Sequence, residues 1–221
     1  MSDPTWPSRL AGQFIVLDGP DGSGKSTQFR RLSALAADHG VTVCEVREPG
    51  GTDIGERVRA ILLDPAVGEM DVRCEMLLYM ASRAQLIAER IRPALRRGEL
   101  VLADRFISST LAYQGAAGGM DEADIRRVGD VAVAGRGPDL VVVFDVDAET
   151  AAGRLNPLLD RMEAKGADYH RRVRRGYLDQ ADAEPDRYLV IDARPDADAV
   201  TNDLLQALAR RFSDQTAGRA P

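Results

Sequence analysis

The chain has 221 residues, 44% of them hydrophobic, and a formal net charge of −6 at pH 7. That length allows one large domain or two small ones, and the apolar fraction is ordinary for a globular protein. The negative charge disfavours a protein that coats nucleic acid, and no apolar run approaches the ~20 residues of a membrane span. Two cysteines without metal-ligand spacing fit a reducing compartment, which predicts a cytoplasmic protein.

The first predicted elements surround a glycine-rich loop. Residues 1–12 have no basic start followed by an apolar core, so we expect a short flexible lead and no signal peptide. The apolar run at 14–18 predicts a buried strand, and the helical periodicity of 25–39 predicts a helix. Between them the pattern G-x-x-x-x-G-K-[ST] is formed by Gly19, Pro20, Asp21, Gly22, Ser23, Gly24, Lys25, Ser26 and Thr27.

Strand, glycine loop and helix are the context in which this pattern binds phosphate. The glycines let successive backbone N–H groups turn toward phosphate oxygens, and the helix N-terminus adds the positive end of its dipole. Lys25 can then reach the β- and γ-phosphates, and the Ser26 hydroxyl can hold Mg²⁺. Only one other lysine, Lys165, occurs among 29 lysines and arginines, which indicates that a compact ammonium is needed here. The sequence predicts a nucleoside triphosphate site rather than a chance glycine-rich turn.

The remaining chain alternates strands and helices. Further strands are expected at 41–47, 100–104, 140–145 and 188–192. Helices are expected at 53–63, 72–97 with a possible break at Pro93, 108–114, 121–134, from about 149, 168–183 and 197–211.

The strands read as nearly continuous apolar runs, which is typical of a parallel sheet covered by helices on both faces. The predicted fold class is α/β, with the three-layer architecture of P-loop proteins and five parallel strands. We expect one domain over 13–212, an irregular stretch at 155–167 and a flexible tail at 213–221. Ligands of such sheets bind beyond the carboxyl ends of the strands, where the sequence places Asp18, Arg47, Asp104, Asp145 and Asp192.

A glycine loop alone does not separate a kinase from a GTPase, a motor or a regulatory ATPase. A GTPase should carry an N-K-x-D motif, and neither lysine of this chain follows an asparagine. A small-molecule kinase needs a second anion site, for which Asp104 and Arg105 are candidates. Asp104 can orient Mg²⁺ or its waters and Arg105 can hold an acceptor phosphate, although a structural acid–arginine pair would give the same pattern. Polar side chains suited to reading a nucleoside follow at one-turn spacing: Ser109, Thr110, Tyr113 and Gln114.

A second candidate for base recognition is the pair Tyr79 and Arg83. Their i, i+4 spacing places the ring and the guanidinium on one helix face, where the ring can stack on a base and Arg83 can donate to a carbonyl. Taken alone, the pattern favours an aromatic core stripe beside an exposed arginine.

Together these motifs resemble the thymidylate kinase family in its bacterial form, over residues 13–210. The resemblance rests on the glycine loop 19–27, Arg47-Glu48-Pro49-Gly50-Gly51-Thr52, Arg83-Ala84-Gln85, the segment 102–114, Pro138-Asp139-Leu140 and Asp160-Arg161. It implies the reaction ATP + dTMP → ADP + dTDP, in dTTP synthesis, with Mg²⁺ held by Ser26 and Asp104. It also implies a homodimer packed through helices, with no nucleic-acid or membrane partner.

The resemblance implies roles for single residues. The loop 19–27 would cradle the ATP phosphates, and Lys25 would draw charge from the transferred group. Asp21 would accept a hydrogen bond from the 3′-hydroxyl of dTMP, and Arg105, with Arg47 or Arg59, would bind its phosphate. Around the nucleoside, Tyr79 would stack on thymine, Arg83 would donate to O4, Ser109, Thr110 and Gln114 would lie near the base, and Tyr113 would lie near C2′.

Residues 154–167 resemble the lid of this family. In members whose glycine loop carries arginine after the acid, that arginine assists the transfer. This chain has Gly22 there, so the resemblance assigns the assisting charge to the lid, with Arg161 as catalytic residue and Arg154 stacking on adenine.

Two other functions remain open from the sequence. One is another small-molecule P-loop kinase, acting on a nucleoside or a different nucleotide. The other is a nucleotide-sensing module of the same fold without catalysis, because the apolar, proline-containing start of the lid departs from the arginine-rich form of the family.

Overall fold

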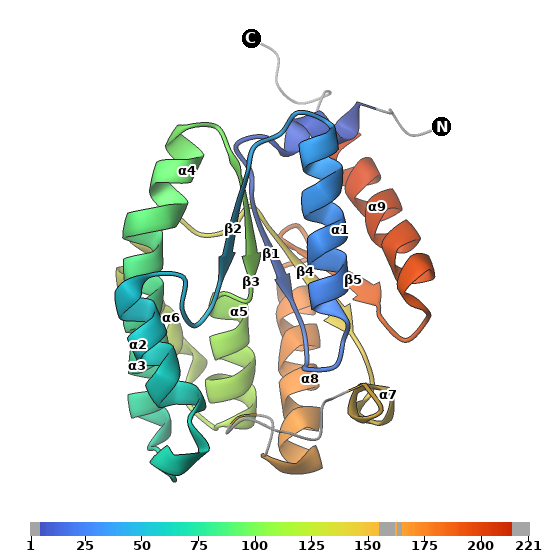
Figure 1. The fold of residues 1–221 in the computed structure, drawn as a ribbon. Helices are drawn as coiled ribbons and strands as arrows, with labels where there is room; N and C mark the ends of the chain where they lie inside the picture. The colour runs from blue at the N-terminus through green and yellow to red at the C-terminus, as the bar shows by residue number, and fades with distance from the viewer. Residues whose placement is uncertain (1–4, 155–161, 163–164, 214–221) are drawn as a thin grey trace.

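The computed structural model describes residues 5–154, 162 and 165–213, which are organised around a sheet of five parallel strands (Figure 1). The spatial order of the strands is β2-β3-β1-β4-β5. Their bounds are β1 Phe14–Asp18, β2 Val43–Arg47, β3 Leu100–Asp104, β4 Leu140–Asp145 and β5 Tyr188–Asp192. The predicted five-stranded parallel sheet is confirmed, with β1 at its centre.

Strand β2 begins two residues later than the apolar pattern predicts. The preceding helix ends at Asp38 and is followed by Gly40, whose φ of 78° lies in the left-handed region that glycine favours. The N–H of Val41 then donates to the carbonyl of Ala36, so Val41 closes the helix instead of joining the sheet.

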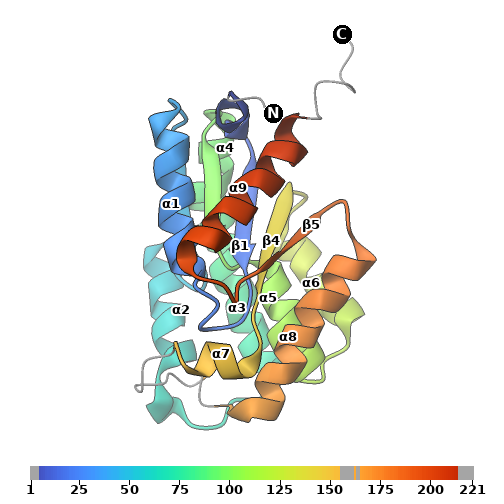
Figure 2. The same cartoon turned by 90° about the vertical axis from the view of Figure 1, so that its right-hand side faces the viewer.

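Helices cover both faces of the sheet (Figure 2). The α-helices are α1 Lys25–Asp38, α2 Asp53–Leu63, α3 Val72–Leu86, α4 Arg92–Arg96, α5 Ile107–Thr110, α6 Glu122–Val133, α7 Ala148–Ala152, α8 Gly166–Ala183 and α9 Ala197–Ser213. Shorter or wider turns are η1 Trp6–Leu10, η2 Pro65–Val67, η3 Ile87–Ile91 and η4 Leu111–Ala117. No helix within these ranges is both long and apolar enough to cross a bilayer.

The alternation of side chains along β1 separates two cores. Ile15 and Leu17 pack with residues of η1, α1 and α9 on one face. Phe14 and Val16 pack with residues of α3, η3, α4, η4 and α8 on the other. All five residues of β1 are buried, which is why this strand reads as a continuous apolar run rather than an alternating one.

The long helix expected at 72–97 forms, with an irregularity in its middle. The chain passes without a gap from α3 through the π-turn η3 to α4. The wide turn directly precedes Pro93, which lacks an N–H and crowds the carbonyl four residues earlier. A wider turn accommodates that missing bond, so the helix continues where the sequence indicated a possible break.

The N-terminal residues differ from the predicted flexible lead. Residues Trp6–Leu10 form a 3₁₀ turn in which Trp6 and Leu10 are buried in the core on the α1 and α9 face. Arg9 donates from Nη1 to the carbonyl of Phe212 at 2.8 Å, so this turn also holds the end of α9. Ser8 and Arg9, two polar residues within this short segment, conceal the apolar face from the sequence pattern.

The carboxyl ends of the strands bring the expected polar residues to one edge of the sheet. In the registers of the ladders Arg47 lies beside Asp104, and Asp145 lies beside Asp192. Leu17 also pairs with Asp104, which places the start of the glycine loop next to the end of β3.

Candidate active site

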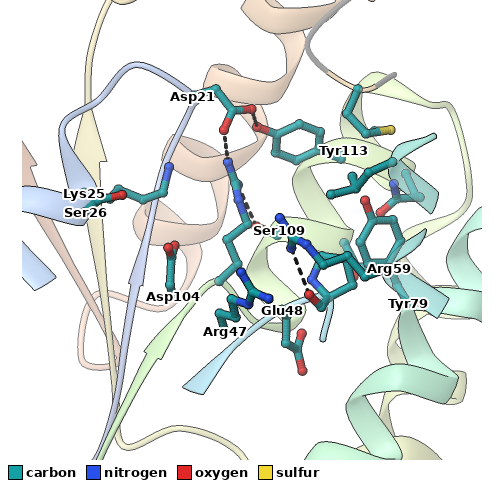
Figure 3. Close-up of a pocket in the computed structure, with 16 residues that line it drawn as sticks. Asp21, Lys25, Ser26, Arg47, Glu48, Arg59, Tyr79, Asp104, Ser109 and Tyr113 are labelled. Carbon is teal, nitrogen blue, oxygen red and sulfur yellow. Dashed lines mark hydrogen bonds and ion pairs between the residues drawn. The ribbon is translucent and has the colours of Figure 1, made fainter. Parts of the chain in front are cut away.

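A cavity of about 290 Å³ opens at this edge, with Lys25, Ser26 and Asp104 on one side and Arg59 and Tyr79 on the other (Figure 3). Its wall contains six predicted site residues from the glycine loop, α1 and the strand ends: Asp21, Lys25, Ser26, Arg47, Asp104 and Arg105. Six more come from helices: Arg59 of α2, Tyr79 of α3, and Ser109, Thr110, Tyr113 and Gln114 of α5 and η4. The structure therefore assembles residues up to 93 positions apart, from 21 to 114, around one space.

The glycine loop is packed tightly between β4 and α7. A Cβ on Gly19 would lie 2.5 Å from the carbonyl oxygen of Phe144, and one on Gly22 would lie 2.4 Å from that of Ala151. Both glycines also have positive φ. No side chain fits at Gly22, which accounts structurally for the absence of an arginine at that position.

Lys25 lies over this loop. Its ammonium donates to the carbonyl oxygens of Gly19 and Pro20, each at 3.0 Å. Burial lowers the pKa of Lys25, and the nearby guanidinium of Arg105 lowers it further. Two cations thus face the same small volume, which suits the binding of anions.

Arg105 reaches the cavity through an unusual backbone conformation. Its φ is +70°, in the left-handed region that non-glycine residues rarely adopt. The guanidinium forms an ion pair with Asp21 and donates to Ser109 Oγ at 3.0 Å and to Tyr177 Oη at 3.2 Å. Burial would raise the pKa of Asp21, but Arg105 and Lys25 outweigh burial and hold it below its ordinary value. Asp21 is therefore a carboxylate that only accepts hydrogen bonds.

Tyr113 completes the contact with Asp21. Its hydroxyl donates to Asp21 Oδ2 at 2.8 Å, and the Arg105 guanidinium lies 5.2 Å from the centre of its ring (Figure 3). Tyr113 and Gln114 belong to η4, a π-turn that the sequence did not indicate. Such wide turns are frequent at functional sites, because they turn neighbouring side chains to one side.

Asp18 organises the residues behind the cavity, and the sequence assigned it no role beyond its place at a strand end. It is fully buried and accepts hydrogen bonds from Ser108 Oγ at 2.6 Å, Ser109 Oγ at 2.8 Å and Tyr177 Oη at 2.6 Å. Burial and the Asp18 charge raise the pKa of Tyr177 well above its ordinary value, so this hydroxyl remains a donor. Tyr177 is 159 positions from Asp18, and no local pattern marks the pairing.

Arg83 lies behind the cavity wall rather than on its surface. Its side chain is 1% exposed, so the exposed arginine that its pattern alone favours is wrong. Its Nε donates to Glu48 Oε2 at 2.9 Å, and its Nη2 donates to the same oxygen at 2.5 Å and to Thr110 Oγ1 at 3.1 Å. Glu48, which sequence reasoning missed, lines the cavity. Within the described residues, its Oε1 is buried without a hydrogen-bond partner.

Other predicted residues do not line the cavity. Arg154 is outside the cavity and donates to the carbonyl oxygens of Ala193 at 2.7 Å and Arg194 at 2.8 Å, between β5 and α9. Thr27 lies in the first turn of α1 and does not line the cavity. Arg161 and most of the predicted lid lie outside the described residues.

The oxygen ligands expected for Mg²⁺ are present on one side of the cavity. Asp104 Oδ1 is buried and has no hydrogen-bond partner among the described residues, and Ser26 lines the same space. In the described ranges no group of three or more His, Cys, Asp or Glu side chains could hold a metal. One carboxylate and one hydroxyl fit an ion that takes its other ligands from water and phosphate, as Mg²⁺ commonly does.

Comparisons with known proteins agree with this arrangement. A family model described as thymidylate kinase matches residues 17–204. The chain belongs to the thymidylate kinase family. Among its relatives, the thymidylate kinase of Deinococcus radiodurans is 48% identical over 206 residues, covering 90% of this chain and 98% of the relative. That of Desulforudis audaxviator is 47% identical over 190 residues, covering 85% and 86%.

A solved structure extends the match to three dimensions. The crystal structure of thymidylate kinase from Ehrlichia chaffeensis is similar with a TM-score of 0.74 and 33% identity, covering 90% of this chain and 98% of that chain. The resemblance inferred from the motifs and the P-loop fold class are thereby confirmed. Membership of the thymidylate kinase family also confirms that the protein is a nucleotide-binding enzyme of the kinase class.

The Glu48→Gln substitution should flatten the pH dependence of stability. Burial raises the pKa of Glu48 to about 7, from an ordinary value of 4.5, although Arg83 opposes the change. Between these values the folded chain retains a proton that the unfolded chain has released, so the free energy of unfolding falls as pH rises. Glutamine is neutral at every pH and removes the contribution of Glu48 to this pH dependence. Urea unfolding at about pH 5 and about pH 8 would measure the change.

The exposed glutamate Glu89 gives the matched control, because Glu89→Gln makes the same change from a carboxylate to an amide at the protein surface. It should retain the pH dependence of the wild-type protein. If the free energy of unfolding changed equally with pH in the wild-type protein and in Glu48→Gln, the assignment of a raised pKa to Glu48 would be contradicted.

Proposed function

We propose that this protein transfers the γ-phosphate of ATP to dTMP and releases ADP and dTDP, as a step in dTTP synthesis. The observation that carries the proposal is the convergence of Lys25 and Arg105 on one cavity from two different segments, the glycine loop and the end of β3. Phosphoryl transfer needs positioning and charge neutralisation more than covalent chemistry. We place the reaction in the cytoplasm, which the free thiols of Cys44 and Cys74 suit.

On the acceptor side, Arg105 would bind the phosphate of dTMP, with Arg47 and Arg59 as further donors. The carboxylate of Asp21 would accept a hydrogen bond from the 3′-hydroxyl of the sugar, while continuing to hold Arg105. The ring of Tyr113, fixed by its bond to Asp21, would lie near C2′, where its bulk disfavours a ribose hydroxyl.

The other end of the cavity would hold the base. Tyr79 would stack on thymine, and the polar groups of Thr110 and Gln114 would lie at its edge, with Ser109 between the base and the phosphate. Arg83 would donate to O4 if the side chain turns from Glu48 toward the cavity. Stacking accepts any base, so discrimination has to come from the polar groups.

On the donor side, the backbone N–H groups of the loop 19–27 would hold the ATP phosphates, and Lys25 would neutralise charge on the transferred group. Ser26 and Asp104 would hold Mg²⁺, which when bound supplies positive charge between the phosphates. Arg154, which donates to the carbonyl oxygen of Ala193 in the β5–α9 connection, remains our candidate for stacking on adenine. Arg161 remains our candidate for the assisting charge.

A substrate panel tests the proposed reaction. With ATP, Mg²⁺ and each nucleoside monophosphate in turn, ADP release should show the highest kcat/KM for dTMP, because the polar groups at the base match thymine. Direct product analysis should show dTDP. Faster turnover of CMP or AMP would instead indicate another small-molecule P-loop kinase, and binding of ATP and dTMP without dTDP would indicate a sensing module.

Removal of either cation should abolish most of the activity. Lys25→Ala and Arg105→Ala should each lower kcat/KM for dTMP by about 100-fold or more, because each removes a charge aimed at the transferred phosphate. Arg30→Ala, which removes an exposed arginine of α1, should leave the rate within about twofold. Near-native activity of a folded Lys25→Ala or Arg105→Ala protein would refute the role of that residue.

We also propose that the protein is a homodimer that packs through α2, α3 and α6. Helix α3 contacts both α2 and α6, and the three helices carry exposed apolar side chains: Ile54, Ile61, Leu77 and Val131. Leu77 is 53% exposed and Val131 81% exposed. A group of apolar side chains on adjoining helices is typical of a surface that another chain covers.

The Leu77→Asp substitution should convert a dimer into a monomer, because it places an unpaired charge in an apolar interface. Light scattering coupled to size-exclusion chromatography measures the mass directly. Val190→Asp changes an exposed apolar residue of β5, away from these helices, and should leave the mass unchanged. A monomeric wild-type protein, or an unchanged mass in Leu77→Asp, would refute this interface.

A further inference from the structure

A buried carboxylate lies behind the cavity wall at Gln114. Glu75 of α3 is 1% exposed, and its Oε1 accepts a hydrogen bond from Nε2 of Gln114 at 2.7 Å. Because a carboxylate only accepts, this bond decides which end of the Gln114 amide faces α3. The amide nitrogen is directed to Glu75, and the amide oxygen is left to the cavity that Gln114 lines.

The charge of Glu75 is compensated by the second lysine of the chain. Lys165 Nζ lies 3.4 Å from both carboxylate oxygens of Glu75 and 4.8 Å from the centre of the Tyr169 ring. A buried carboxylate without a partner is costly, and an ammonium at this distance offsets that cost. Tyr169 in turn donates from its hydroxyl to the carbonyl oxygen of Tyr113 at 2.8 Å, within the same π-turn as Gln114. Lys165 thus holds the Glu75 carboxylate, and Tyr169 holds the backbone next to Gln114.

We infer that Glu75, with Lys165, sets base specificity by fixing the orientation of the Gln114 amide. This rests on the proposed binding of dTMP in the cavity. Thymine and uracil carry an N–H at ring position 3, where cytosine carries an unprotonated acceptor nitrogen. A fixed amide oxygen accepts from the N–H and meets the cytosine nitrogen as a second acceptor, which leaves two buried acceptors unpaired. Glu75 is therefore a positioning residue that acts through Gln114.

Two other residues that line the cavity near the base, Thr110 and Tyr79, lack this fixed polarity, and the donor-only Arg83 would act at O4 rather than at N3. The hydroxyl of Thr110 already accepts a hydrogen bond from Arg83 Nη2 at 3.1 Å. Its own hydrogen can rotate toward an acceptor on the base or away from the base, so Thr110 does not distinguish the two cases. Tyr79 offers a ring face, which does not distinguish pyrimidines. Gln114 is the base-side residue whose donor end is bound to a charged partner, so it carries the discrimination of N3.

The test compares three pyrimidine monophosphates in the full-length enzyme. Glu75→Met keeps the side-chain length and removes the acceptor, so the Gln114 amide can present either end. The ratio of kcat/KM for dTMP to that for dCMP should fall by about tenfold or more. The change should come mainly from a higher KM for dTMP, while the ratio for dTMP to dUMP stays within about twofold because both bases carry the N3–H.

The matched control is Glu89→Met. Glu89 accepts a hydrogen bond from Gln85 and is exposed on the same helical stretch, so this change removes an equivalent glutamate–glutamine pair away from the cavity. All three kcat/KM ratios should remain those of the wild-type enzyme. A merely structural effect of Glu75→Met would lower the activity toward all three nucleotides together and would overturn the inference.

Substitutions of Lys165 test the same arrangement without changing α3. Lys165→Met removes the ammonium beside Glu75 and loosens the carboxylate that orients the Gln114 amide, so the dTMP-to-dCMP ratio should fall in the same direction. Lys165→Arg keeps the charge and should restore the ratio. If neither Glu75→Met nor Lys165→Met alters the ratio, the inference fails while the proposed function stands. If the wild-type enzyme makes no dTDP, the proposed function itself fails.

Discussion

Two cations at the edge of one sheet, the buried Lys25 and the partly buried Arg105, are the constraint on which the rest of the structure depends. Lys25 and Arg105 repel one another, and they remain together because Asp18, Asp21 and Asp104 surround them. These five groups alone carry one net negative charge. An anionic ligand would need further positive charge to approach such a set, and Arg47 and Arg59 supply it on the same cavity wall. In the proposed reaction Mg²⁺ would add to it.

The geometry around these charges is fixed by two unusual backbone segments, at Gly22 and at Arg105. Gly22 packs so closely against the carbonyl of Ala151 that the loop cannot carry an arginine of its own there. At the end of β3, Arg105 adopts a left-handed conformation, held by its bonds to Asp21, Ser109 and Tyr177. Strain at such a position persists only where the surrounding contacts determine it. In the proposed reaction, an assisting arginine would therefore have to come from another segment.

The sequence predicts those features that depend on neighbours along the chain. The inner strands β1, β3 and β4 are predictable because each is an apolar run buried on both faces, whereas the edge strands β2 and β5 alternate buried and exposed residues. The glycine loop is predictable because the spacing of its glycines is set by backbone geometry. The Asp18–Tyr177 bond, the Glu48–Arg83 pair and the Glu75–Gln114 bond join residues at least 35 positions apart, and no local pattern encodes them. The helical pattern at Tyr79 and Arg83 suggested an exposed arginine, because it contains no sign of the distant carboxylate that lets Arg83 be buried.

Helix α3 connects the proposed recognition of the base with the proposed interface between subunits. Glu75, Tyr79 and Arg83 follow one another at four-residue spacing, so they share the face of α3 that is directed to the cavity and its wall. Leu77 stands two residues from Glu75 and Tyr79 and lies on the opposite face, exposed. A second subunit packed on Leu77 would limit the movement of α3 as a whole and, with it, the positions of all three inward residues. Dimer formation and base selection would then depend on the same helix, although the two surfaces share no side chain.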